Sequence, residues 1–206
     1  LDPMNWDRLF EDLEGQLASE WEAERAALDA ESERVRISQL ALRTRLRAMS
    51  ARRASIVIEL VNGRRMPVIL RTVGADWLAA EISTALGALA SRSMLVVPLR
   101  AIQSLGSDHG MLLSSLEEDA DPPSILRERM TLGFVLRDLA RRRVALHLST
   151  TRGDDVHGTI DRAGADHLDL AVHDAGTARL ASAVQSFRIV PFEALVAIRL
   201  AGDQRL

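Results

Sequence analysis

The chain contains two copies of one strand–turn–strand pattern, ninety positions apart, and this repeat limits the fold more than any other feature. The stretch GDDVHGTIDRAGADHLDLAV begins at Gly153, and a weaker copy, GRRMPVILRTVGADWLAAEI, begins at Gly63. The triplet Gly-Ala-Asp occupies the same place in both. After a three-residue difference in length, the correspondence resumes in the segments VPLRAI and VPFEAL. An internal duplication predicts that the chain builds the same unit twice.

The residues of both copies alternate between apolar and polar, as short β-strands require. Asn62 and Gly63 form a hairpin turn signal between the first two strands. The five strands predicted for the first copy are 55–60, 66–70, 77–82, 95–97 and 101–105, and a second run of five begins at Val144. Five short strands separated by tight turns are typical of a small β-barrel, so the sequence predicts two barrels.

The segment from Asn5 to about Ser50 lacks proline and has helical periodicity close to that of a coiled-coil seam. The predicted interaction seam of this segment is Trp6, Phe10, Leu13, Leu17, Trp21 and Leu28. Acidic residues dominate from Glu11 to Glu33, whereas every charged residue from Arg34 to Arg53 is an arginine. The two halves could pair antiparallel, within a hairpin or between two chains. The sequence leaves open whether the segment is one long helix or a hairpin.

A polar stretch from Gly106 to Pro123 is rich in glycine, serine and acids and is predicted to be a linker. A second helix is predicted from Ile125 to about Arg142, before the second run of strands. The predicted boundaries are 1–3 for a cloning remnant, 4–32 for a helical extension, 33–106 for the first unit, 107–122 for an acidic linker, 123–202 for the second unit and 203–206 for a tail.

The second copy resembles the first sequence motif of the Sm-like (LSm) family. The residues that carry this resemblance are Gly153, Gly158, Ile160, Asp166, Leu168, Leu170 and Val172. The family fold is a helix followed by a strongly bent five-stranded barrel. The resemblance therefore implies an α+β chain with two Sm-like barrels, each preceded by a helix. In the first copy Val68 replaces the bending glycine and follows Pro67, and a proline there predicts an edge strand or a bulge.

Family members that bind uridine-rich RNA stack a base on an aromatic residue, read it with an asparagine two residues later and complete the pocket with an arginine. The resemblance places Trp77 and His167 at the stacking position and Arg100 in the last loop. Ala79 and Asp169 stand at the reading position, where alanine cannot hydrogen-bond a base and aspartate repels phosphate. The alternative interpretation of Trp77 is a large apolar residue packed against a helix.

Arginine-rich helix faces are a second candidate for nucleic-acid binding. All 26 basic residues are arginine, but a net charge of −3 gives no general attraction to nucleic acid. The candidate residues are Arg43, Arg45, Arg47, Arg52, Arg53, Arg141, Arg142 and Arg143. Affinity through such residues would fall steeply with salt.

Strand alternation places His147, His157 and His173 on the outer side of the second barrel, where three imidazoles in a row could bind zinc. Chance proximity of exposed side chains is the alternative. The chain has no cysteine, and no enzyme motif occurs, so neither a catalytic residue nor a cofactor is predicted. No apolar run approaches the roughly 20 residues that span a bilayer. A cytoplasmic protein without membrane contact is expected.

Two functions are favoured by these patterns, and a third, an enzyme that uses the histidine row, has no nucleophile or general base to support it. The first is a non-catalytic protein-interaction scaffold, in which the N-terminal helix recruits a partner helix or forms a homodimer. Sm-like barrels commonly join strand four of one unit to strand five of the next, and a duplicated chain could make that contact internally. The alternative is an RNA-binding or other nucleic-acid-binding Sm-like protein that uses the arginine-rich helix faces.

Overall fold

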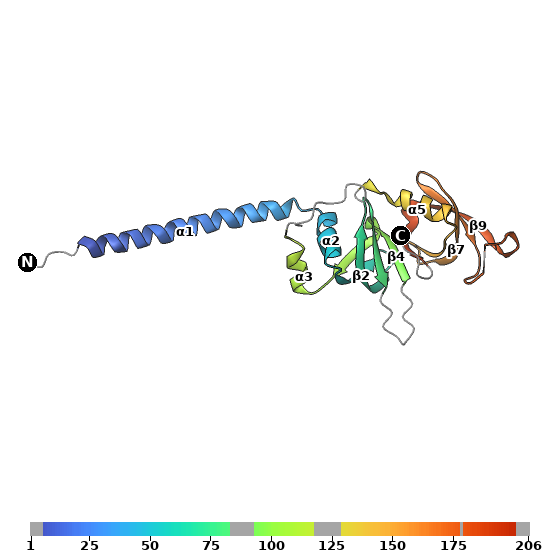
Figure 1. Cartoon of the computed structure of the whole chain (residues 1–206), viewed down its shortest axis with the longest axis horizontal. Helices are drawn as coiled ribbons and strands as arrows, with labels where there is room; N and C mark the ends of the chain where they lie inside the picture. The colour runs from blue at the N-terminus through green and yellow to red at the C-terminus, as the bar shows by residue number, and fades with distance from the viewer. Residues whose placement is uncertain (1–5, 83–92, 118–128, 178, 201–206) are drawn as a thin grey trace, which may run out of the picture. The chain divides into compact units, whose positions relative to one another are not determined.

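The computed structural model describes residues 6–82, 93–117, 129–177 and 179–200 (Figure 1). The chain divides into two compact units, residues 1–42 and 43–206. The predicted cloning remnant, the tail, the start of the second helix and most of the acidic end of the linker lie outside the described residues. None of the helices in the described ranges has the length and apolar character that a membrane span needs.

Two helices, not one, occupy the N-terminal segment. Helix α1 runs from Trp6 to Ser38, and helix α2 runs from Leu42 to Ala51. The backbone NH groups of Gln39 and Leu40 bond carbonyls three residues earlier, which tightens the last turn of α1 and ends it. The segment is therefore not one long helix: it breaks at residues 39–41, and three arginines of the arginine-rich stretch, Arg43, Arg45 and Arg47, lie on α2.

The second unit contains one ten-stranded antiparallel sheet. The strands of the first half are β1 (Ser55–Leu60), β2 (Arg65–Val73), β3 (Trp77–Ile82), β4 (Ser93–Pro98) and β5 (Ile102–Gly106). Those of the second half are β6 (Ala145–Thr150), β7 (Asp155–Ala163), β8 (His167–Val172), β9 (Ser186–Pro191) and β10 (Leu195–Leu200). The strand order is β5-β1-β2-β3-β4-β10-β6-β7-β8-β9, so each half follows the same internal order.

The prediction of two closed Sm-like barrels is wrong, because the sheet is open and continuous. To close separately, each half would need its two end strands to pair with each other. Strand β4 instead pairs with β10 of the other half, with Val96 opposite Ile198. Strand β10 also pairs with β6, so it joins the two halves. This junction leaves β5 and β9 as the two edges of the sheet.

The hydrophobic interior does not divide into one core for each half. Helix α5 (Leu132–Arg141) packs on the strands of the second half, but its cluster also contains Trp77, Ala79 and Val96 from the first half. The other cluster contains α2 and the strands of the first half, together with Val196 and Ala197 from β10. Each core is therefore completed by residues of the other half.

Local structure nevertheless repeats closely between the halves. Helices α2 and α5 end in the same way, with Arg53 and Arg143 in the left-handed region at φ 49° and 54°. In both, the next residue donates its NH to a carbonyl five positions earlier, which is the Schellman motif. The pairings of β2 with β3 and of β7 with β8 share a register shift, at Leu70 to Thr72 and at Ile160 to Arg162.

The second strand of each half differs at one point of the repeat: the first half has Val68 after Pro67, and the second half has Gly158. Strand β2 is an interior strand and its register shift lies beyond Pro67, so the predicted edge or bulge at this proline is not observed. Pairing of β2 with β3 begins at Val68, and Pro67 pairs only with Val57 of β1. In the second half Gly158 is needed because a Cβ there would lie 2.3 Å from the carbonyl oxygen of Ala171.

Part of the predicted linker is helical and packs on the first half. Helix α3 (His109–Ser114) is capped by Asp108, whose carboxylate accepts from the NH of Met111. Met111 and Leu112 contact the hydrophobic cluster of the first half. Three short 3₁₀ turns complete the described elements: η1 (Leu99–Ala101), η2 (Ala181–Ala183) and η3 (Phe192–Ala194).

Candidate protein-interaction surfaces

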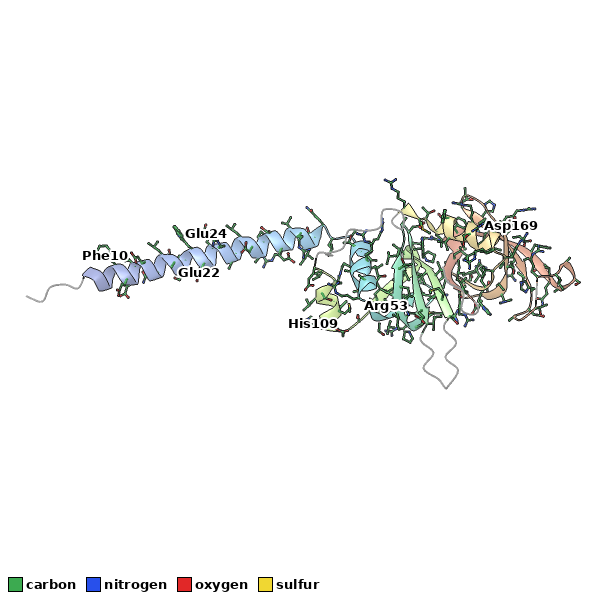
Figure 2. The ribbon with its side chains drawn as sticks, viewed as in Figure 1. Phe10, Glu22, Glu24, Arg53, His109 and Asp169 are labelled. Carbon is green, nitrogen blue, oxygen red and sulfur yellow. The ribbon has the colours of Figure 1, made fainter. Side chains whose placement is uncertain are left out.

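Helix α1 carries a row of exposed apolar side chains. The predicted seam residues Phe10, Leu13, Leu17, Trp21 and Leu28 are all exposed, and Trp21 is the most open of them at 74%. Phe10 is labelled in Figure 2, together with Glu22 and Glu24 of the same helix. The side chain of the remaining seam residue, Trp6, lies outside the described side chains. The spacing of these residues is that of a helix that packs on another helix.

Helix α1 is strongly acidic from Asp7 to Glu33. It carries ten acidic residues against four arginines. Two of these arginines, Arg34 and Arg36, form ion pairs with Glu31 and Glu33 on the preceding turn. The hydrogen bond from Arg36 also lowers the pKa of Glu33 below its ordinary value. The apolar seam is therefore flanked mainly by negative charge.

Trp77 lies in the junction between the halves and is buried. Its indole NH donates to the carbonyl of Met130 at 2.8 Å. The neighbouring Asp76 accepts from the NH of Leu132 at 2.7 Å, and so it binds the start of α5. The structure thus places Trp77 as the alternative interpretation predicts, packed against the beginning of a helix. A base could stack on this ring only if the residues that bury it moved away.

The other residues of the predicted RNA pocket, Arg100 and His167, both adjoin the end of β9, where His167 lies opposite Pro191. Arg100 donates to the carbonyl of Phe192 in the other half. His167 is exposed, and its Nδ1 lies 2.8 Å from the Asp166 carboxylate. The hydrogen bond with His167 lowers the pKa of Asp166 below its ordinary value, so an anion stands beside the stacking position.

Most of the predicted arginine faces are involved in contacts within the protein. On α2, Arg45 donates to Ser115 and to the Leu112 carbonyl. Arg52 bonds the carbonyl of Ala48 and pairs with Glu117. At the end of α5, Arg141 and Arg142 pair with Asp138, and Arg143 pairs with Asp161. Arg53 takes the left-handed conformation that ends α2. The remaining two, Arg43 and Arg47, are half-buried on α2. These contacts reduce the positive charge that could attract phosphate.

The predicted histidine row forms on β6, on β7 and at the residue that follows β8. The ring centroids of His147 and His157 lie 4.7 Å apart, and those of His157 and His173 lie 4.9 Å apart. His173 is buried, with Nε2 2.9 Å from the Thr159 hydroxyl and Nδ1 3.1 Å from the Asp174 carbonyl. Both of its nitrogens are therefore engaged in hydrogen bonds. In the part of the chain that the structure describes, no three His, Cys, Asp or Glu side chains are placed to hold a metal ion.

The other two histidines of the row are His157 and His147. The Nδ1 of His157 lies 3.0 Å from the carbonyl of His173 and donates to it. Burial lowers the pKa of His147, and the nearby Arg199 and His157 lower it further. The neutral form of His147 is therefore favoured, which suits a ring that meets the His157 ring edge to face at an interplanar angle of 64°.

Strand β9 carries an apolar pair that the sequence reasoning did not select. Phe187 and Ile189 are exposed on this edge strand, at 68% and 73%. Comparison of the two repeats could have revealed them, because they correspond to Met94 and Val96 of β4. The signal was missed because both faces of β9 contain apolar residues, and alternation alone does not say which face is covered.

Comparison of this chain with protein-family models, with curated proteins and with solved structures finds no match.

Proposed function

We propose that this protein is a non-catalytic interaction scaffold whose helix α1 recruits a partner helix. The observation that carries this proposal is the exposed seam of Phe10, Leu13, Leu17, Trp21 and Leu28. Burial of one such side chain contributes about 1.5–3 kcal/mol. Four or five of them in register contribute about 6–15 kcal/mol, against an association cost of about 4–15 kcal/mol.

The charge of α1 favours one kind of partner. Eight acidic residues lie between Asp7 and Asp29, along the seam, so a second α1 would bring like charges together along the interface. Like charges at the flanking positions of a coiled coil disfavour pairing, whereas opposite charges select a partner. We therefore assign α1 a partner helix with apolar a and d positions and lysine or arginine at the flanking positions.

The proposal can be tested with two synthetic heptad peptides that share one apolar seam. The first carries lysine at the flanking positions and the second carries glutamate. Trp21 is exposed and reports binding directly, because its fluorescence shifts to the blue when its ring leaves water. We expect the lysine peptide to bind and shift the emission, with an affinity that falls as salt rises. The glutamate peptide should bind far more weakly.

A matched pair of variants separates the seam from the rest of α1. Leu17→Glu places a charge in the seam and should abolish binding, whereas Ser19→Glu adds the same charge outside the seam residues. Equal binding by both variants, or no binding of either peptide, would contradict the proposal. Light scattering on the chain alone would show whether α1 pairs with itself, in which case the inferred charge preference is wrong.

A further inference from the structure

One charged residue, Glu24, lies within the apolar seam of α1. Successive residues of an α-helix turn by about 100°, so the exposed seam residues lie within an arc of about 80° around α1. Leu13 and Trp21 mark the two borders of this arc. Glu24 lies inside it, about 20° around the helix from Leu17 and about 40° from Leu28. Every other residue of 10–28 inside the arc is apolar, so a single carboxylate interrupts the seam.

Glu22 is the contrasting acidic residue on the same helix. It lies about 160° around the helix from Glu24. Figure 2 shows the two side chains on different sides of α1, with Phe10 on the side of Glu24. Both glutamates are exposed. A helix that packs on the seam would therefore cover Glu24 and leave Glu22 in water.

Helix α1 supplies no cation to Glu24. Side chains meet along a helix at spacings of three and four residues. Around Glu24 these positions hold Glu20, Trp21, Ala27 and Leu28. Nearer the end of α1, by contrast, Glu31 and Glu33 pair with Arg34 and Arg36. A partner that covers Trp21 and Leu28 would remove water from a carboxylate that has no neutralising group, which is strongly unfavourable unless the partner provides one.

A second copy of α1 cannot provide this cation from its own seam. All four arginines of α1 lie outside the seam arc, and Arg25, the closest to it, is about 40° beyond the border at Trp21. Pairing of two seams would therefore place Glu24 against apolar residues or against another carboxylate. The residue that neutralises Glu24 must come from a helix with a different sequence.

We propose that Glu24 selects and aligns the partner helix of α1 by pairing with one arginine in the partner's own apolar seam. This inference rests on the proposed function of α1 and adds one position to the partner's description. Arginine suits the site better than lysine, because its planar guanidinium binds a carboxylate through two parallel hydrogen bonds and is less strongly hydrated. A single polar pair in an apolar seam fixes the register, since any shift of the partner leaves both charges buried without a counterion.

The test uses the full chain and a set of peptides based on the lysine-flanked heptad peptide described above. In each peptide of the set, arginine replaces one seam residue. Trp21 fluorescence measures the affinity of each peptide. We expect one arginine position to bind about tenfold or more tightly than the unmodified lysine peptide. Glu24→Gln should remove this preference, because it removes the charge and keeps the size of the side chain.

Glu22→Gln is the matched control, since it removes the same charge from the side of α1 that the partner leaves uncovered. It should retain the preference for the arginine peptide. If the lysine peptide binds but no arginine position improves its affinity, or if the preference survives Glu24→Gln, the role of Glu24 is refuted and the α1 seam still stands as the binding surface. If no peptide of either kind binds, the proposed function of α1 and this inference both fail. Circular dichroism checks that both variants keep the helix content of the unmodified chain.

Discussion

The sharpest prediction concerns Gly158, where β7 approaches β8 more closely than any side chain allows. A Cβ at this position would lie 2.3 Å from the carbonyl oxygen of Ala171 and 3.1 Å from its carbonyl carbon. The first distance is about 1 Å short of van der Waals contact. The obstructing atoms belong to the backbone of a paired strand, so they cannot rotate away as a side chain would.

The cost of Gly158→Ala follows from this geometry. Overpacking of a close-packed interior typically costs about 1–3 kcal/mol, and the stiffer unfolded chain offsets about 0.5 kcal/mol of it. A net loss of about 2 kcal/mol is expected at a residue buried between β6 and β8. With a urea m-value of about 2 kcal/mol/M, the midpoint of unfolding should fall by about 1 M.

The assay is urea unfolding followed by circular dichroism, with Gly106→Ala as the matched control. A Cβ at Gly106 meets the Val57 side chain at 3.8 Å, which is an ordinary contact, so this replacement should change stability little. If Gly158→Ala lowers the midpoint no more than Gly106→Ala does, the close approach of β7 and β8 is not as described here and the reasoning fails.

Three further predictions concern a helix end, the core and a histidine. Arg53→Gly should stabilise the protein by about 1 kcal/mol, because glycine adopts φ 49° without strain, and thermal unfolding would show a higher Tm. Leu168→Ala should cost about 2–5 kcal/mol in denaturant unfolding because Leu168 is fully buried, and a near-neutral result would contradict the β8 register. The folded protein holds the pKa of His147 below its ordinary value of 6.5, so stability should be full above that pH and fall as the pH drops through 6.5 toward the lower folded value. In His147→Gln this part of the pH dependence should be absent when unfolding is measured across that range.

Much of the local structure could be predicted from the sequence because it depends on neighbouring residues. Apolar alternation predicted strands in both copies, and the turn glycines Gly63 and Gly153 have positive φ values of 81° and 87°. The ninety-residue offset reappears in α2 and α5 and in the shared register shifts. The break after Ser38 was not predicted, because residues 39–41 contain neither proline nor glycine and the helical periodicity continues through them.

Of the candidate surfaces, the sequence could predict only those that depend on neighbouring residues. The α1 seam follows from spacing along a single helix, and its exposed residues agree with that spacing. The surroundings of Trp77 could not be derived in this way, because Met130 lies more than fifty positions away along the chain. The exposure of Ile189 depends on which strands stand beside β9, and that is a property of the whole sheet.

The sequence alone therefore determined the repeat, the strands, the turns and the acidic amphipathic helix, since each of these depends on side chains within a few positions. Only the tertiary structure decided that β4 pairs with β10 and that the sheet remains open. The physical reason is that strands pair through backbone NH and carbonyl groups, which are the same in every residue except proline. The free side of a strand such as β4 can accept any strand that reaches it. The pairing with β10 buries Val96 and Ile198 in one hydrophobic cluster, and this burial selected β10.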